Sequence, residues 1–174
     1  MNLQEENFIK RRASELWNKN VIDDFEMGKT VGIQSIHRYI FNGIVSKPGT
    51  IRQVDIQEEN FIYSPALFIV TNLNAIDDMP FENFDQIVAK FVEMSTAHPF
   101  MRGNDFVTRM WLDQMLIDKL SKCVDWSKID KYDYLRKLEE ASFDDSQMNE
   151  LLKSALIDVT NNRQLHIGGL DILY

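Results

Sequence analysis

The stretch HPFMRGNDFVTR, residues 98–109, decides the fold because it separates two strongly apolar helical patterns. Upstream, apolar residues recur at helical spacing as far as His98, where Pro99 disfavours a helical conformation of its predecessor. Downstream, an apolar pattern begins at Val107 and continues to Leu120 over most of the helix circumference, so this helix should lie near the centre of the core. The stretch is therefore predicted to be the loop that leads into a central helix.

The residues that open this central helix are suited to bind an anion. Gly103 permits a tight turn, and Asn104 and Asp105 are both good N-cap residues. The first amides of a helix have no intrahelical partner, so its N-terminus is a ready site for a phosphate. Arg109 follows about one and a half turns later, near enough to contact a second phosphate. His98, with an ordinary pKa of about 6.5, is suited to take a proton from an attacking hydroxyl.

Each of these residues also has an ordinary structural interpretation. A lone histidine before a proline is usually structural, and Phe100 is more often a core anchor than a ligand contact. Gly103-Asn104 alone is a common turn signal. Only their combination favours a functional site.

That combination resembles the signature of the Fic family, His-x-Phe-x-(Asp/Glu)-Gly-Asn-(Gly/Lys)-Arg-x-x-Arg. His, Pro, Phe, Gly and Asn stand in register within residues 98–109, and the resemblance spans roughly residues 25–174. It implies an all-α Fic fold, a helical bundle around a central buried helix with one β-hairpin flap. Because the chain has no internal repeat or linker, we expect residues 1–174 to form a single domain.

Fic proteins are mostly protein adenylyltransferases, which transfer AMP from ATP to a hydroxyl of a target protein. The resemblance implies that His98 deprotonates this hydroxyl, that Gly103 and Asn104 bind phosphates and that Phe100 holds the loop in the core. Arg109 matches the second motif arginine, which contacts the phosphate tail. ATP is then the substrate and a protein the partner, with type II topoisomerases as targets of similar small bacterial Fic proteins.

Three positions depart from the family pattern. Arg102 replaces the Asp or Glu that binds Mg²⁺, and a donor-only cation cannot ligate a metal. Asp105 places a negative charge beside the phosphate site, and Phe106 removes the first motif arginine. We hypothesise that Arg102 neutralises phosphate charge in place of Mg²⁺. The alternative is a catalytically impaired Fic-fold protein that acts as a protein-interaction module.

Residues 49–63 predict a β-hairpin, because Val54 and Ile56 alternate with polar residues before a turn-forming stretch at 58–60. In the Fic resemblance this hairpin is the flap, and Val54, Asp55 and Ile56 would dock an extended segment of the target by strand addition. The alternative is an ordinary surface hairpin.

Helical patterns elsewhere predict the rest of the bundle. His37 lies in one of these patterns, and we interpret it as a packed helical histidine. Besides the two helices that flank the loop, one is predicted near residues 4–18 and another begins at Asp144-Asp145. Three more are predicted to be capped by Thr30, by Ser64 ahead of Pro65, and by Ser127.

Composition excludes several classes of function. Hydrophobic residues make up 44% of the 174 positions, which suits one compact core, and a net charge of -8 argues against a nucleic-acid surface. A single cysteine, Cys123, excludes an intrachain disulfide. No apolar run is long enough for a membrane span and no signal peptide is present, so a cytoplasmic protein is expected. Homo-oligomer formation is left open.

The tail, residues 161–174, resembles the C-terminal region of small Fic proteins that carry their own inhibitory helix. Their inhibitory glutamate pairs with the second motif arginine, whereas this sequence ends before such a glutamate. We therefore expect either a longer protein or one that lacks this inhibitory contact.

Overall fold

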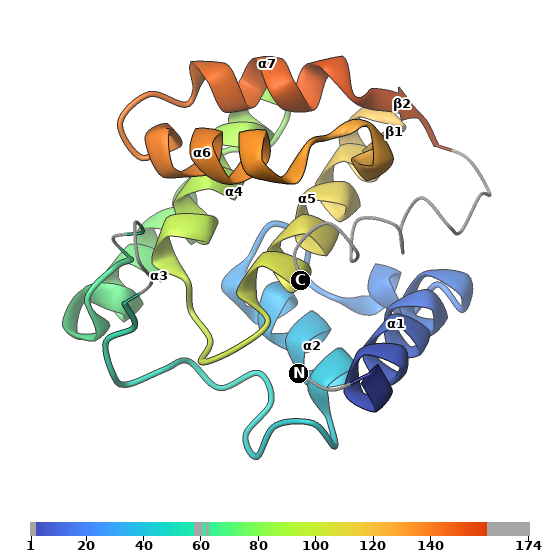
Figure 1. The fold of residues 1–174 in the computed structure, drawn as a ribbon, viewed down its shortest axis with the longest axis vertical. Helices are drawn as coiled ribbons and strands as arrows, with labels where there is room; N and C mark the ends of the chain where they lie inside the picture. Colours follow the sequence, from blue (N-terminus) through green and yellow to red (C-terminus); the bar gives the residue numbers. More distant parts are fainter. Residues whose placement is uncertain (1–2, 58–60, 62, 160–174) are drawn as a thin grey trace.

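The computed structural model describes residues 3–57, 61 and 63–159, and this part of the chain forms a helical bundle with one small sheet (Figure 1). The predicted all-α architecture is confirmed. The α-helices are α1 (Leu3–Asn18), α2 (Thr30–Phe41), α3 (Ile69–Asp78), α4 (Phe84–Ala97), α5 (Asn104–Leu120), α6 (Lys131–Ala141) and α7 (Ser146–Ser154). Short 3-10 helices are η1 (Val21–Asp24), η2 (Ala66–Phe68) and η3 (Trp126–Lys128), and the strands are β1 (Lys122–Val124) and β2 (Leu156–Asp158).

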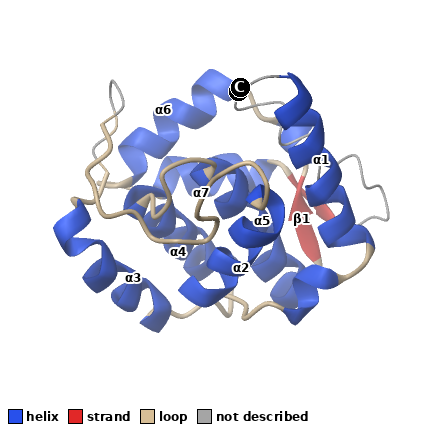
Figure 2. Cartoon of the chain, turned by 90° about the horizontal axis from the view of Figure 1, so that it is seen from below, coloured by secondary structure: helices blue, strands red, loops and turns tan. Residues whose placement is uncertain are grey.

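Helix α5 is the centre of the bundle, as its all-round apolar pattern predicts. Trp111, Leu112 and Met115 are fully buried, and the helix contacts α4, α2 and β1. Figure 2 shows α2 and α4 beside it, with α1, α3 and α6 further out. Because α5 is enclosed, its polar residues Arg109 and Asp113 are buried as well, and each must find partners inside the protein.

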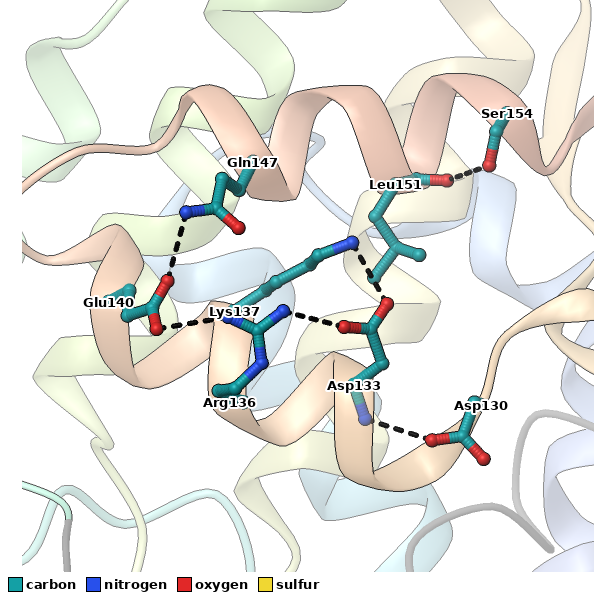
Figure 3. A network of polar contacts seen from close by, with 8 residues as sticks. All are labelled: Asp130, Asp133, Arg136, Lys137, Glu140, Gln147, Leu151 and Ser154. Carbon is teal, nitrogen blue, oxygen red and sulfur yellow. Dashed lines mark hydrogen bonds and ion pairs between the residues drawn. The ribbon is translucent and has the colours of Figure 1, made fainter.

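Helices α6 and α7 pack as a pair at the top of Figure 1 and are joined by a polar network at their surface (Figure 3). Arg136 binds Asp133 at 2.8 Å and Glu140 at 3.0 Å, and Gln147 of α7 donates to Glu140 at 3.1 Å. Exposed ion pairs of this kind contribute little to stability, so the pair depends on its buried apolar side chains. These include Leu138, Ala141, Met148 and Leu152.

The sheet lies where the sequence shows no strand pattern. Strand β1 pairs antiparallel with β2, with Cys123 opposite Ile157. Each strand has three residues, which is too short to display an alternating pattern. The sheet closes the bundle beside the C-terminal end of α5.

The hairpin predicted over residues 49–63 is not formed by the described residues of this segment. Residues 49–57 follow a loop without a strand, and Phe61 makes an isolated bridge; the predicted turn at 58–60 lies outside the described residues. The backbone N–H of Arg52 donates to the carbonyl of Pro99 at 2.8 Å. The segment thus bonds to the loop before α5 rather than forming paired strands.

Two predicted helix caps are wrong. Thr30 is the first residue of α2, and its N–H and hydroxyl both donate to the Asp77 carboxylate, at 2.6 and 2.8 Å, at the end of α3. Ser127 lies in η3, and α6 is instead capped by Asp130, whose side chain accepts from the N–H of Asp133. At α2, Thr30 bonds to Asp77 of another helix instead of capping its own helix. At α6, Asp130 lies at the N-cap position and takes the place predicted for Ser127.

The segment that begins at Ser64-Pro65 forms η2 before α3 starts at Ile69. Three apolar residues assigned to this helical pattern face solvent: Leu67 is 84% exposed, Phe68 54% and Val70 61%. Their exposure leaves an apolar surface beside the loop of residues 49–57. Residues of this loop and of the η2–α3 segment line one shared groove.

In the described ranges, none of the helices is both long and apolar enough to cross a membrane. The tail, residues 161–174, lies outside the described residues.

Candidate active site

His98 terminates α4 in a left-handed conformation, with φ 47° and ψ 62°. Its backbone N–H still bonds to the carbonyl of Met94, at 3.1 Å, while Pro99 directs the chain away from the helix. The predicted helix exit at His98 is confirmed. A histidine with positive φ is uncommon, and such strained positions are often found at functional sites.

The imidazole ring of His98 is buried beneath Tyr63. The centroids of the Tyr63 and His98 rings lie 3.7 Å apart, with the ring planes 26° from parallel. Phe61 in turn stacks on Tyr63, with ring centroids 5.6 Å apart. His98 is 6% exposed, and within the described chain its Nδ1 atom has no hydrogen-bond partner. A buried polar atom left without a partner is rare and points to a site that a ligand completes.

Burial, followed by the positive charge of Arg52, lowers the pKa of His98 to about 3, whereas the Ser95 backbone acts in the opposite direction. The imidazole is consequently neutral at pH 7. A neutral imidazole has the lone pair that a proton acceptor needs.

Arg52 joins the loop of residues 49–57 to the end of α4. Its Nε donates to the carbonyl of His98 at 2.7 Å, and Nη2 donates to the carbonyl of Ala97 at 3.2 Å. The same guanidinium also donates to the carbonyl of Val54, inside the predicted flap, and to that of Ser64, just after it. The sequence reasoning missed this residue, although a basic residue inside a stretch with apolar alternation was a usable signal.

The N-terminus of α5 carries no side-chain cap. Gly103 is the N-cap residue with φ 78°, and the side chain of Asn104 turns back to bind both the N–H and the carbonyl of Phe100, each at 2.7 Å. By contrast, the side chain of Asn83 caps α4. The predicted capping role of Asn104 is therefore wrong: it closes the loop upon itself, and the first amides of α5 are not consumed by a cap side chain.

Helix α2 supports this loop through His37 and Phe41. The Nε2 of His37 lies 3.0 Å from the carbonyl of Arg102, and its Nδ1 accepts the N–H of Gly49 at 2.8 Å. Phe41 packs so closely on Gly103 that an added Cβ would lie 2.2 Å from its Cζ. His37 is a packed helical histidine as predicted, and burial lowers its pKa to about 4, so it is neutral and holds the turn before α5.

The two arginines predicted to bind phosphate point in different directions. Arg102 forms an ion pair with Glu5 of α1, at 3.1 Å, and its side chain is 40% exposed. Arg109 is 3% exposed, its Nε donates to the carbonyl of Asp105 at 3.2 Å, and its guanidinium lies 5.0 Å from the ring centroid of Trp126 in η3. The structure thus does not bring these two cations together.

Asp105 and Phe106 occupy the first turn of α5. Asp105 is half-buried, and its charge acts on Tyr134 of α6, whose pKa is raised mainly by burial. Phe106 is 4% exposed and lies edge-on to Phe41, with ring centroids 6.2 Å apart. In place of the family's first motif arginine, this chain therefore has a core residue.

The three predicted target-docking residues, Val54, Asp55 and Ile56, lie in the loop of residues 49–57. The carbonyl of Val54 accepts a hydrogen bond from Arg52, and the Asp55 carboxylate accepts the N–H of Ala66 at 2.7 Å. Val54 and Asp55 are exposed, and Ile56 is half-buried. Their surface remains accessible to a partner, although it is not a strand.

Two cavities adjoin the loop. One of about 250 Å³ lies beside the Tyr63 cover, between Ser95 and Thr96 of α4 and Leu138 and Phe143 of the α6 region. The other, about 310 Å³, is lined by Lys47, Arg102 and Phe100, among others. The first is next to the catalytic candidate, and the second is next to the cation that replaces the acidic motif residue.

The residues present do not fit a divalent metal site. Across residues 3–57, 61 and 63–159, no group of three or more His, Cys, Asp or Glu side chains could hold a metal ion. The motif position that should supply a carboxylate carries Arg102, which has no acceptor atom.

A sequence profile of the Fic/DOC family matches residues 29–116, slightly more than half of the chain. The chain belongs to the Fic/DOC family. The match includes α2, the loop that contains Arg52, His98 and most of α5, which are the parts that build the candidate site.

Comparison with known proteins supports the same assignment. Protein adenylyltransferase VbhT of Bartonella schoenbuchensis is 24% identical over 173 residues, and the match covers 92% of this chain. This chain spans about a third of the length of that relative, 35%.

Solved structures of Bartonella effector proteins share the fold. BepC from Bartonella tribocorum, solved with bound AMPPNP, has a TM-score of 0.73 at 14% identity and covers 90% of this chain and 86% of its own. The N-terminal Fic domain of a cell filamentation protein from Bartonella quintana, solved with bound ADP, has a TM-score of 0.74 at 14% identity and covers 93% and 86%.

Proposed function

We propose that this Fic-family protein transfers AMP from ATP to a hydroxyl of a target protein, with His98 as the general base. The observation that carries the proposal is the buried Nδ1 of His98, which has no hydrogen-bond partner in the described chain and lies in the loop before an uncapped helix N-terminus. The name of the VbhT relative and the nucleotide-bound Fic structures support the same chemistry.

The proposed reaction needs one proton acceptor and a site for polyphosphate. The target hydroxyl oxygen attacks the α-phosphorus of ATP, a new P–O bond forms, and the bond from the α-phosphorus to the pyrophosphate oxygen breaks. His98 takes the hydroxyl proton, and pyrophosphate leaves. The amides of α5 that follow Gly103 stabilise the phosphate charge, and Arg109 contributes its positive charge from the same helix.

Charge neutralisation by Arg102 replaces that by a metal ion in this proposal. The Arg102–Glu5 pair is half-exposed, and such pairs are worth roughly 0–1 kcal/mol, so little free energy keeps Arg102 away from a phosphate. The cavity of about 310 Å³ that Arg102 lines gives its side chain room to move. Asp105 remains a negative charge near the helix N-terminus and should weaken phosphate binding.

The cavity of about 250 Å³ beside Tyr63 is the proposed site for the nucleotide base. It adjoins His98 through Ser95 and Thr96, and its walls include the apolar side chains of Leu138 and Phe143. A flat, largely apolar base fits such walls, and the phosphates would then extend toward α5.

The target is proposed to dock on the loop that contains Val54, Asp55 and Ile56. This loop is attached to the backbone of His98 through Arg52, so a segment bound there lies near the imidazole. The family assignment supports a protein target, and a bacterial type II topoisomerase is the narrower target that we propose.

Nucleotide binding tests this proposal before any target is known. ATP at millimolar concentration should raise Tm by about 2 °C or more in both the wild-type protein and the His98→Ala variant. The His98→Ala variant serves as a control, because it removes the base and keeps the phosphate site. The absence of a shift in both proteins would exclude nucleotide use.

A second candidate function is protein binding without catalysis. The burial of His98 beneath Tyr63 and the exposure of Leu67, Phe68 and Val70 favour it. A partner captured equally by the wild-type protein and by His98→Ala, with no AMP transferred to it, would support this candidate.

A further inference from the structure

We propose that Arg52 is a positioning residue for the reaction assigned to His98: its guanidinium fixes the backbone of the catalytic histidine and attaches it to the target-docking loop. This inference rests on the proposed function, because only an AMP transfer gives His98 a catalytic role. The contact between Arg52 and His98 can be tested without that reaction.

The contacts of Arg52 concentrate on one point of the chain. Its side chain donates to the carbonyls of Ala97 and His98, and its own backbone N–H donates to the carbonyl of Pro99. Three successive carbonyls at the end of α4 are thus held by one residue 46 positions away in sequence from His98. These are carbonyls that a helix end leaves without intrahelical partners.

This arrangement explains how His98 keeps an uncommon backbone conformation. A left-handed histidine has a higher energy than a helical one, so surrounding contacts must hold it there. The Nε–carbonyl bond of 2.7 Å acts directly on the peptide that follows the His98 Cα. The direction of the imidazole therefore depends on the guanidinium.

The second pair of contacts extends the same control to the target. Arg52 also donates to the carbonyl of Val54 in the docking loop and to that of Ser64, which follows this loop. Because one rigid, planar group holds both the docking loop and the His98 backbone, the distance from a docked hydroxyl to the imidazole is set by Arg52.

Electrostatics provides a separate readout. The Arg52 cation is the charge that acts on the His98 ring, Tyr63 covers the ring face, and the Ser95 backbone favours the protonated ring. Arg52→Lys keeps the positive charge and loses the planar fork, whereas Arg52→Gln loses both. The two variants therefore separate positioning from charge.

The test combines two measurements on the full chain. The first is an NMR titration of the His98 imidazole between pH 4 and pH 8. It should stay neutral throughout in the wild-type protein and in Arg52→Lys, and its midpoint should move upward in Arg52→Gln. The second is the kinetics of AMP transfer, in which both variants should lower kcat about tenfold or more and leave the KM for ATP within about twofold.

Arg12→Gln is the matched control, because Arg12 also donates twice to a backbone carbonyl, that of Tyr39, and lies on α1 away from His98. It should reduce Tm and change neither the His98 titration nor kcat.

If Arg52→Lys unfolds, the titration of Arg52→Gln below its Tm still tests whether Arg52 acts on His98. Unchanged His98 shifts and unchanged kcat in folded Arg52 variants would overturn the inference. If the wild-type protein transfers no AMP, the proposed function fails, and the NMR titration alone tests the contact.

Discussion

The rings of Tyr63 and His98 stack face to face with centroids 3.7 Å apart, so the proposed base is covered in this structure. Because His98 is only 6% exposed beneath this ring, we expect the proposed catalysis to require movement of the Tyr63 side chain. The population of the uncovered state should then limit the rate.

Tyr63→Ala should uncover His98. A stacked aromatic pair is worth about 0.5–1.5 kcal/mol, so its loss should raise the population of the uncovered state roughly 2- to 13-fold. The rate of His98 modification by diethyl pyrocarbonate, resolved by mass spectrometry, measures this population. Tyr63→Phe keeps the stacked ring and serves as the control for loss of the hydroxyl; equal modification rates in the wild-type protein and Tyr63→Ala would show that Tyr63 is no barrier.

Arg102→Glu should restore a dependence on metal. With a carboxylate at the motif position, Mg²⁺ gains an oxygen ligand, so ATP should raise Tm more in Mg²⁺ than in EDTA. In the wild-type protein the shift should be nearly the same in both conditions, because Arg102 is a cation. Glu5→Gln, which only releases Arg102 from its ion pair, is the control. A wild-type shift that vanishes in EDTA would contradict the role given to Arg102.

Gly103→Ala should destabilise the fold by about 2–4 kcal/mol, measured by urea unfolding. The new Cβ meets the Phe41 ring at 2.2 Å, and φ of 78° is unfavourable for alanine. Gly43→Ala separates the two effects, because Gly43 has φ 89° and no atom within 4 Å of an added Cβ. We expect Gly43→Ala to lower the free energy of unfolding by about 1 kcal/mol. Equal losses for Gly43→Ala and Gly103→Ala would refute close packing of the loop on α2.

Asp113 should give the stability a specific pH dependence. Its carboxylate is buried on α5 and accepts the N–H of Val124 at 3.0 Å and the indole N–H of Trp126 at 3.1 Å, yet burial raises its pKa from 3.8 to about 6. The folded state then holds more protons than the unfolded state between these values, so this contribution to the free energy of unfolding falls as pH rises from about 4 to about 6.

Comparison with Asp113→Asn isolates this effect from the other carboxylates. The stability advantage of the wild-type protein over Asp113→Asn should decrease by roughly 2 kcal/mol from pH 4 to pH 7. Urea unfolding at several pH values measures it. An advantage that grows with pH would mean that the nearby Arg109 outweighs burial and keeps Asp113 ionised.

Helical periodicity and local spacing were sufficient to predict α4, α5 and the loop between them. His98, Gly103 and Asn104 are close in sequence, so any turn that joins the two helices brings them together. Burial of α5 also followed from its pattern, because a helix that is apolar on all sides has to be enclosed.

The features that sequence reasoning missed depend on contacts between distant residues. Arg52 and Tyr63 reach His98 only through the path of the loop after α2, which the local pattern does not determine. The alternation around Val54 suggested a strand, but the backbone N–H of Arg52 found its partner at Pro99 instead. Helix ends compete for the same hydrogen-bonding groups as strands, and local propensity does not decide that competition.

His98 is proposed to be the base of an AMP transfer. The most direct test is incubation of the protein with α-phosphate-labelled ATP and cell lysate, in the presence and absence of Mg²⁺. Label should pass to a protein, and His98→Ala should reduce the initial rate by about 10²- to 10⁴-fold. Equal labelling by His98→Ala, or no labelling by either the wild-type protein or the uncovered Tyr63→Ala variant, would contradict it.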